Sequence, residues 1–337
     1  MGRSPASRLL ARTWLSAFDP HDNGITGARL VLASLVIVSH SVALAGLGLE
    51  PLVAETGASL GFLAVITFFT LSGFLLARSR ERTDVVPFVR NRLLRIVPGY
   101  WLALIFSALV ALAFGASLDG AADYVTSNLG LLVRGAHGTE AFGGSPLNGS
   151  LWSLRVEMAA YIGLVVIPRR WLRPVALGEF LILLPIAFDR NIADTALLLA
   201  FASGVCAWLW RDRIPMIPIL AVPAFLIGNA FAWPLAVIAC GYVGIALARL
   251  PWRLERDLSY GMYVLAYPVQ LAIATAGLPL PIMAAASLAV IVPLAFLSWT
   301  FIESPALSLR GRFGVRRSSP SWRPRLGVLG EPAGGPR

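Results

Sequence analysis

Long apolar runs separated by short polar segments dominate this chain. A bilayer core takes about 20 apolar residues per helix, so runs of this length predict membrane helices. Prolines interrupt the region 151–250, where a kinked helix and a loop give the same pattern. The pattern predicts an all-α, polytopic membrane protein of about ten transmembrane helices. The runs lie at about 26–46, 58–77, 97–117, 151–168, 171–188, 194–210, 214–230, 232–249, 259–277 and 282–302.

The positions of the arginines predict the orientation of these helices. All 28 basic residues are arginine. If the N-terminus is cytoplasmic, 24 of them fall in cytoplasmic segments, and only Arg134 and Arg190 fall outside. This asymmetry follows the positive-inside rule. We therefore expect both the N- and C-termini to be cytoplasmic.

Composition excludes several classes of protein. Hydrophobic residues make up 57% of the chain and charged residues 14%, whereas a soluble domain carries about 25% charged residues. A soluble enzyme, a nucleic-acid-binding domain and a disulfide scaffold are all excluded, although the net charge is +10. We expect a cytoplasmic N-terminal segment (1–25), a transmembrane domain (26–305) and a basic, disordered cytoplasmic tail (306–337) lying on anionic lipid. The longest outside segment, 118–150, is predicted to be a surface loop or lid.

Ionisable residues at membrane depth are costly, so each one is a functional hypothesis. Arg29 and His40 lie on one predicted helix, on nearly the same face and about 16 Å apart along its axis. Glu157 would lie about 9 Å below the outer edge of its own span, near the depth of His40. The pair could be a base and its orienting partner. The alternative reading is structural: His40 bonds a neighbouring helix, while Arg29 and Arg155 reach the interfaces.

Two arginines share a helix face at the start of the third run. Arg92 and Arg95 are spaced i, i+3, and Arg90 lies beside them. Guanidinium groups bind phosphates in a forked geometry, so this patch is a candidate phosphate site. The alternative is that it serves ordinary membrane topology.

Six segments together resemble the bacterial acyltransferase-3 family of integral membrane O-acyltransferases. They occur in the family's order and cover nearly the whole chain. The segments are GARLVLASLVIVSHS (27–41), FFTLSGFLLARS (68–79), NRLLRIVPGYW (91–101), SLWSLRVEM (150–158), LSYGMYVLAYPV (258–269) and FIESPA (301–306).

The resemblance implies an enzyme of the bacterial cytoplasmic (inner) membrane. Such enzymes move an acyl group, often acetyl, from acyl-CoA to a hydroxyl of a glycan or another extracytoplasmic acceptor. The family's essential arginine and histidine correspond to Arg29 and His40, and its donor-nucleotide segment to Arg92 and Arg95. The glutamates of its later motifs correspond to Glu157 and Glu303.

This chain departs from the family pattern at one position and in its domain content. Tyr267 stands where the family often has a histidine, and a tyrosine cannot act as a base near pH 7. The hydrolase-like periplasmic domain that some relatives carry is not recognisable here. The chain is therefore expected to complete the transfer alone or with a separate periplasmic transferase partner.

Residues and resemblance together predict a mechanism. Coenzyme A would dock on Arg92 and Arg95, and its pantetheine arm would bring the thioester to His40. His40 would act as general base or as an acylated nucleophile, and Glu157 would orient it or bind the acceptor. Glu303 is expected to pair with a basic residue such as Arg95.

Two other functions remain as alternatives, and no metal site is expected. The three histidines, His21, His40 and His137, share no ligand spacing. A transporter or flippase for a glycan or lipid-linked precursor would also need many spans and intramembrane charges. Such a protein typically has an inverted repeat, and none is apparent in this sequence. A purely structural membrane subunit would leave His40 and Glu157 unexplained.

Overall fold

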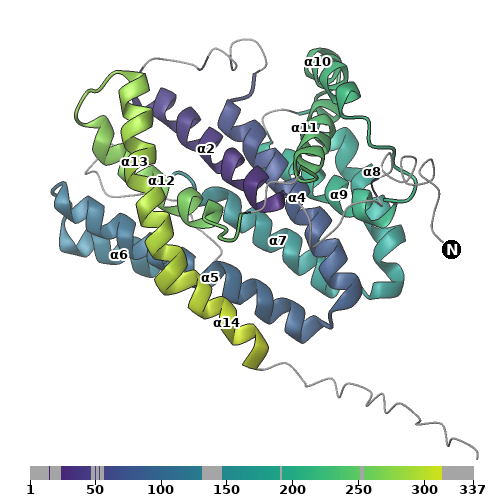
Figure 1. Ribbon diagram of the computed structural model, residues 1–337, viewed down its shortest axis with the longest axis horizontal. Coiled ribbons are helices and arrows are strands. Elements are labelled where there is room, and N and C mark those ends of the chain that lie inside the picture. Colours follow the sequence, from purple (N-terminus) through teal and green to yellow (C-terminus); the bar gives the residue numbers. More distant parts are fainter. Residues whose placement is uncertain are drawn as a thin grey trace, which may run out of the picture.

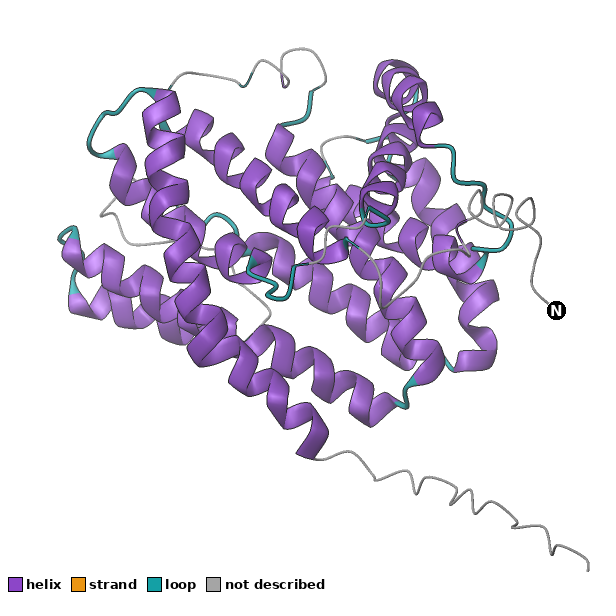
Figure 2. Cartoon of the chain, in the orientation of Figure 1, coloured by secondary structure: helices purple, strands orange, loops and turns teal. Residues whose placement is uncertain are grey.

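The computed structural model describes residues 15, 24–46, 50, 53, 57–130, 146–189, 192–250 and 254–312, and within these ranges all regular structure is helical (Figures 1 and 2). The chain is thus all-α in its described part, as the apolar pattern predicts. The main helices are α2 (Ile25–Leu44), α4 (Leu60–Arg82), α5 (Val85–Ala113), α6 (Leu118–Asn128), α7 (Trp152–Val166), α8 (Leu172–Ile186), α9 (Ala193–Leu209), α10 (Ala221–Phe231), α11 (Trp233–Leu247), α12 (Ser259–Ala274), α13 (Leu280–Ser298) and α14 (Ser304–Arg312).

Each of the ten apolar runs contains a helix, but four helical segments are long and apolar enough to cross a membrane. These are 25–44, 60–82, 85–113 and 280–310. The last combines α13, a π-helical turn (Trp299–Glu303) and α14 in one helix. The helices within 151–250 are shorter, and prolines mark two of their boundaries, since Pro168 follows α7 and Pro218 precedes α10. The membrane character is therefore confirmed, whereas the count of ten spans and the side of the termini stay predictions.

Three boundaries differ from the sequence prediction. The loop predicted from residue 118 is wrong for 118–128, which form α6, with the side chain of Ser117 capping its first turn at 3.1 Å. Residues 131–145 of that loop lie outside the described residues. Helix α5 begins at Val85 rather than near 97, so the basic segment is already helical. The tail predicted to be disordered from 306 stays helical to Arg312, and its remainder, 313–337, lies outside the described residues.

Helix α4 lies at the centre of the fold and packs against α2, α9 and α11 (Figure 1). Its crossing with α9 is close because both helices have glycine at the contact. A Cβ atom at Gly73 would lie 2.1 Å from the carbonyl oxygen of Phe201, and one at Gly204 would lie 2.0 Å from that of Thr70. Small residues let membrane helices approach at backbone distance. Close packing of α4 on α9 therefore accounts for the glycine of the second motif, Gly73.

The turn before α7 lies in the interior. Leu147, Asn148, Ser150 and Leu151 are each at most 1% exposed. The Asn148 side chain donates to the carbonyl oxygen of Val264 at 2.8 Å and to the Ser107 hydroxyl at 3.1 Å. These bonds satisfy a buried amide that would otherwise be costly. Helix α7 consequently begins inside the molecule.

Candidate active site

Three cavities adjoin one another between α2, α4, α7 and α12. A basic cavity of about 290 Å³ shares Arg29, Ser72, Glu157 and Tyr260 with a neck of about 50 Å³. The neck shares Val65 and Tyr263 with a cavity of about 150 Å³ that contains His40. Arg29 and His40, eleven residues apart on α2, are separated by about 16 Å along the helix. The three cavities therefore lie one after another between Arg29 and His40, and we call this series the path.

The basic cavity contains a chain of alternating charges. The Asp257 carboxylate contacts the Arg29 guanidinium at 3.0 Å and that of Arg95 at 2.5 Å. Arg95 also contacts Glu303 at 3.2 Å, which is the pairing that the sequence predicts. Glu303 is only 1% exposed and accepts a hydrogen bond from the Ser298 hydroxyl at 3.1 Å. Arg95 is thus neutralised by two carboxylates.

Asp257 precedes α12 and is held ionised by its neighbours. Burial by itself would raise the pKa of this carboxyl group. The guanidinium groups of Arg29 and Arg95 and the hydrogen bonds from Ser259 outweigh burial and lower the pKa below the ordinary value. Asp257 is therefore a permanent anion that joins α2 to α5.

Tyr260 reaches the cavity because α5 has glycine where the ring crosses it. A Cβ atom at Gly99 would lie 2.5 Å from the ring of Tyr260. The ring contacts the Arg95 guanidinium, 5.5 Å from its centroid, and the hydroxyl donates to the carbonyl oxygen of Ile96 at 2.7 Å. The Pro98-Gly99 pair of the third motif therefore helps shape the basic cavity.

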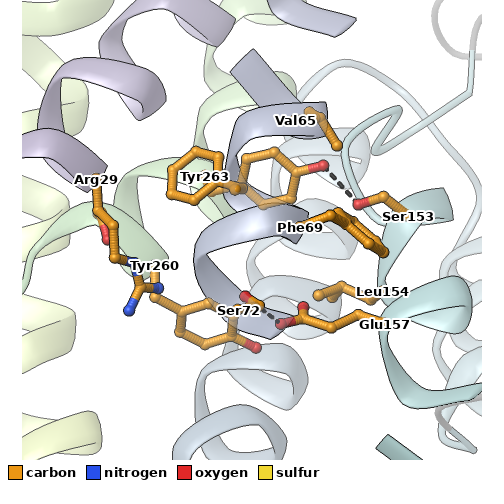
Figure 3. Close-up of a pocket in the computed structure, with 11 residues that line it drawn as sticks. Arg29, Val65, Phe69, Ser72, Ser153, Leu154, Glu157, Tyr260 and Tyr263 are labelled. Carbon is orange, nitrogen blue, oxygen red and sulfur yellow. Dashed lines mark hydrogen bonds between the residues drawn. The ribbon is translucent and has the colours of Figure 1, made fainter. Parts of the chain in front are cut away.

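Figure 3 shows the neck, where side chains of α4, α7 and α12 converge. The Glu157 carboxylate accepts a hydrogen bond from the Tyr161 hydroxyl and a longer one, 3.4 Å, from Ser72. On the side towards His40, the hydroxyl groups of Ser153 and Tyr263 are 2.7 Å apart. A carboxylate and a pair of hydroxyls therefore line a narrow passage.

His40 lies at the other end of the path. Its imidazole ring meets the Tyr267 ring edge-on, with centroids 5.2 Å apart. Its Nδ1 atom is buried and has no hydrogen-bond partner among the described residues. An unpaired buried nitrogen is unusual and is typical of a functional group. Tyr267 thus supports the ring of a histidine that lines the cavity.

Glu50 is the carboxylate that acts electrostatically on His40. It accepts a hydrogen bond from Ser39, the residue before His40, and another from the backbone NH of Leu60 at 2.9 Å. Glu50 thereby ties α2 to the first turn of α4 beside the His40 cavity.

The expected contact between His40 and Glu157 is not found. Glu157 lines the basic cavity and the neck with Arg29, whereas the His40 cavity is lined by Ser150 and Trp152 at the start of α7. The sequence prediction assumed that this helix starts at the membrane edge. Because α7 instead starts inside the molecule, Glu157 lies one to two turns beyond His40, towards Arg29.

Several residues of the path were not singled out by sequence reasoning. Asp257 and Glu50 lie in segments between helices, where carboxylates are ordinary, and nothing in the local pattern distinguishes them. Ser153 and Tyr263 do lie within recognised motifs, which was the available signal. In the sequence, nothing distinguishes Arg310 from the other basic residues of the tail.

Comparisons with known proteins agree with the motif resemblance. The model of the Acyl_transf_3 family, described as an acyltransferase domain, matches residues 22–301. The chain is 28% identical to an O-acetyl transferase of Shigella phage Sf6, over 84% of this chain and 97% of that protein. It is 29% identical to nodulation protein 10 of Rhizobium leguminosarum bv. viciae, over 89% of this chain and 97% of that protein.

A third relative is matched over a shorter length. The chain is 30% identical to the exopolysaccharide production protein ExoZ of Rhizobium meliloti, over 56% of this chain and 59% of ExoZ. The aligned part thus spans less than two thirds of that relative. No solved structure matches the chain.

Proposed function

We propose, from the premise that this chain belongs to the Acyl_transf_3 family and is an acyltransferase, that it moves a short acyl group from acyl-CoA to a hydroxyl of a cell-surface or exported glycan. The relatives named as an O-acetyl transferase and an exopolysaccharide production protein support acetyl and a glycan as substrates. We place the enzyme in the bacterial cytoplasmic membrane, with the basic cavity at the cytoplasmic side. The observation that carries the proposal is the path from the basic cavity to His40.

The path fits the dimensions of coenzyme A. The phosphate-bearing end matches the basic cavity, and the pantetheine arm, up to roughly 20 Å when extended, matches the 16 Å rise from Arg29 to His40. The neck, at about 50 Å³, has room for a thin chain or a few water molecules. This width favours acetyl over bulky acyl groups. It also argues against a transporter or flippase, because a sugar ring is wider than such a chain.

The cavity around His40 offers groups suited to a sugar hydroxyl. Ser59 and Ser150 line it, together with Trp152. The indole of Trp152 stacks on the ring of Phe62 with centroids 6.5 Å apart. Apolar ring faces beside hydroxyls are a common lining of ligand sites. We therefore place the acceptor here, either the final glycan or a carrier served by a separate periplasmic transferase.

The transfer proceeds by general base catalysis. His40 removes the proton of the acceptor hydroxyl, and the oxygen attacks the thioester carbonyl. The new C–O bond forms, the C–S bond breaks, and the imidazolium returns the proton to the leaving thiolate. The Asp257 carboxylate orients the Arg29 guanidinium by their ion pair. The Glu157 carboxylate accepts hydrogen bonds from Tyr161 and Ser72 and places a negative charge at the neck. An acylated His40 is the covalent variant of the same step.

The test is acyl transfer by the purified protein in nanodiscs. With labelled acetyl-CoA, wild type is expected to release label from coenzyme A, and His40→Gln to lose at least about 100-fold in rate, the usual effect of a general base. The control is Arg155→Gln, since Arg155 is half-exposed, pairs with Asp194 and lines none of the three cavities. Full activity of His40→Gln would overturn the role of His40. If the wild-type protein neither binds nor turns over any acyl-CoA, the proposal that acyl-CoA is the donor is wrong.

A further inference from the structure

Two arginines of the basic cavity form no direct ion pair with a carboxylate of the described residues. The cavity is lined by Arg29, Arg92, Arg95 and Arg310. Arg29 and Arg95 form ion pairs, but Arg92 and Arg310 form none among the described residues. The Nε atoms of Arg92 and Arg310 are buried without hydrogen-bond partners there. The two partly buried guanidinium groups repel each other, and the Nε donor of each lacks an acceptor.

The fold nevertheless holds Arg310 at the cavity. A guanidinium nitrogen of Arg310 donates to the carbonyl oxygen of Asn91 at 3.0 Å. In return, the Arg90 side chain donates to the carbonyl oxygen of Arg310 at 3.1 Å. These reciprocal bonds clip α14 to the first turns of α5, and Figure 1 shows the two helices side by side. A side chain that could extend into solvent is instead fixed beside Arg92.

We propose that Arg92 and Arg310 form a phosphate-binding site for the phosphate-bearing end of the acyl donor. Phosphate oxygens would supply acceptors for the two unpartnered Nε donors and would offset the repulsion between the two positive charges. Trp299 and Leu307 line the same cavity and offer apolar surface to the rest of the nucleotide. The inference rests on the proposed function, because it takes coenzyme A as the donor.

This assignment changes the roles suggested by the motifs. Arg95, at the centre of the basic motif, is held by Asp257 and Glu303 and becomes a structural ion-pair residue. Arg310 lies beyond residue 301, where the family match ends. The donor site is therefore completed by α14.

The experiment measures binding of adenosine 3′,5′-bisphosphate to the full chain in nanodiscs of neutral phosphatidylcholine. Arg310→Gln is expected to weaken binding about 10- to 100-fold, the effect of losing one charge-assisted hydrogen-bonding group. Arg213→Gln is the matched control, because this substitution removes the same charge from an exposed side chain outside the cavity. Arg310→Lys, which keeps the charge without the fork, is expected to bind with intermediate affinity. In turnover, Arg310→Gln should raise KM for acetyl-CoA and leave kcat nearly unchanged.

Each outcome has a distinct meaning. If wild type binds the bisphosphate and both Arg310 variants bind it equally well, the phosphate site is overturned while the donor proposal stands. If wild type binds neither the bisphosphate nor acyl-CoA, the proposed function itself fails. A third outcome is that phosphatidylglycerol raises the unfolding temperature of wild type but not of Arg310→Gln, while both bind the bisphosphate equally well. The site then holds a lipid headgroup, and its assignment to the donor is overturned. Adenosine, which lacks phosphate, should bind wild type and Arg310→Gln alike.

Discussion

Asp257 illustrates how a single side chain organises the candidate site. Its carboxylate contacts Arg29 of α2 and Arg95 of α5 at the same time, and it accepts hydrogen bonds from Ser259 at the start of α12. Three helices are therefore tied together at one buried anion. The family arginine, Arg29, has its orientation set by this contact.

Removing this charge should destabilise the protein strongly. Asp257→Asn leaves Arg29 without its partner and Arg95 with only Glu303. Breaking a fully buried ion pair on one side costs about 3–5 kcal/mol, because the remaining charge is uncompensated. The Arg29 and Asp257 side chains are 24% and 19% exposed, so the loss should lie at the lower end of that range. We expect a clear fall in the thermal unfolding temperature of the detergent-solubilised protein.

The matched control for this prediction is Asp194→Asn. Asp194 pairs with Arg155, and both side chains are more than 40% exposed. An exposed pair contributes about 0–1 kcal/mol, so the unfolding temperature should change little. Equal losses in the two variants would contradict the structural role of Asp257.

At the scale of elements, the position of α4 depends on small residues at its contacts. Gly73 of α4 meets the backbone of α9, and Gly204 of α9 meets that of α4. The neck is built on the same helix, because Val65, Phe69 and Ser72 project from it towards α7 (Figure 3). A shift of α9 against α4 is therefore expected to move one wall of the path.

Two glycine substitutions should have opposite effects. In Gly73→Ala the new methyl group would lie 2.1 Å from the carbonyl oxygen of Phe201, so the helices must separate at a cost of about 1–3 kcal/mol. At Gly163 of α7 a methyl group would have no neighbour within 4 Å among the described residues, so Gly163→Ala should stabilise its helix by up to about 1 kcal/mol. Thermal unfolding of both variants checks this. A Gly73→Ala protein as stable as wild type would show that α4 and α9 are not in close contact.

At the scale of the whole molecule, the three cavities extend from an arginine-rich part of the protein to the part that contains His40. Arg90, Arg92 and Arg95 meet Glu303 and Arg310 although more than 200 residues separate them in the chain. The sequence assigns these arginines to cytoplasmic segments and predicts one of the contacts, the pairing of Glu303 with Arg95. The enzyme proposal requires this end to face the cytoplasm, where acyl-CoA is made.

Labelling of single cysteines tests that orientation. In a background with Cys206 and Cys240 replaced by serine, Asp119→Cys on α6 should react with an impermeant maleimide in intact spheroplasts. Arg213→Cys should react only after the membrane is permeabilised. Both positions are exposed, so access depends on the side of the membrane. The reverse pattern would contradict the predicted topology and the cytoplasmic donor site.

Local chemistry allowed much of this protein to be predicted from its sequence. In a membrane each apolar run must satisfy its backbone groups within itself, so helices follow directly from hydropathy. The ends of α2, α9 and α12 agree with the apolar runs to within three residues. Arg29 and His40 share one helix, so their spacing along the path follows from the helical rise.

Which side chains meet depends on how the helices pack against one another. The depth of Glu157 depends on where α7 begins, and that is set by Asn148 bonding to Val264, 116 residues away. The partners of Arg95 come from two other segments, around 257 and 303. Such contacts depend on the depth and rotation of each helix against the others, which hydrophobic periodicity does not specify. For that reason the helices and the motif residues follow from the sequence, whereas the packing of the helices places Glu157 at the neck and Tyr267 and Glu50 beside His40.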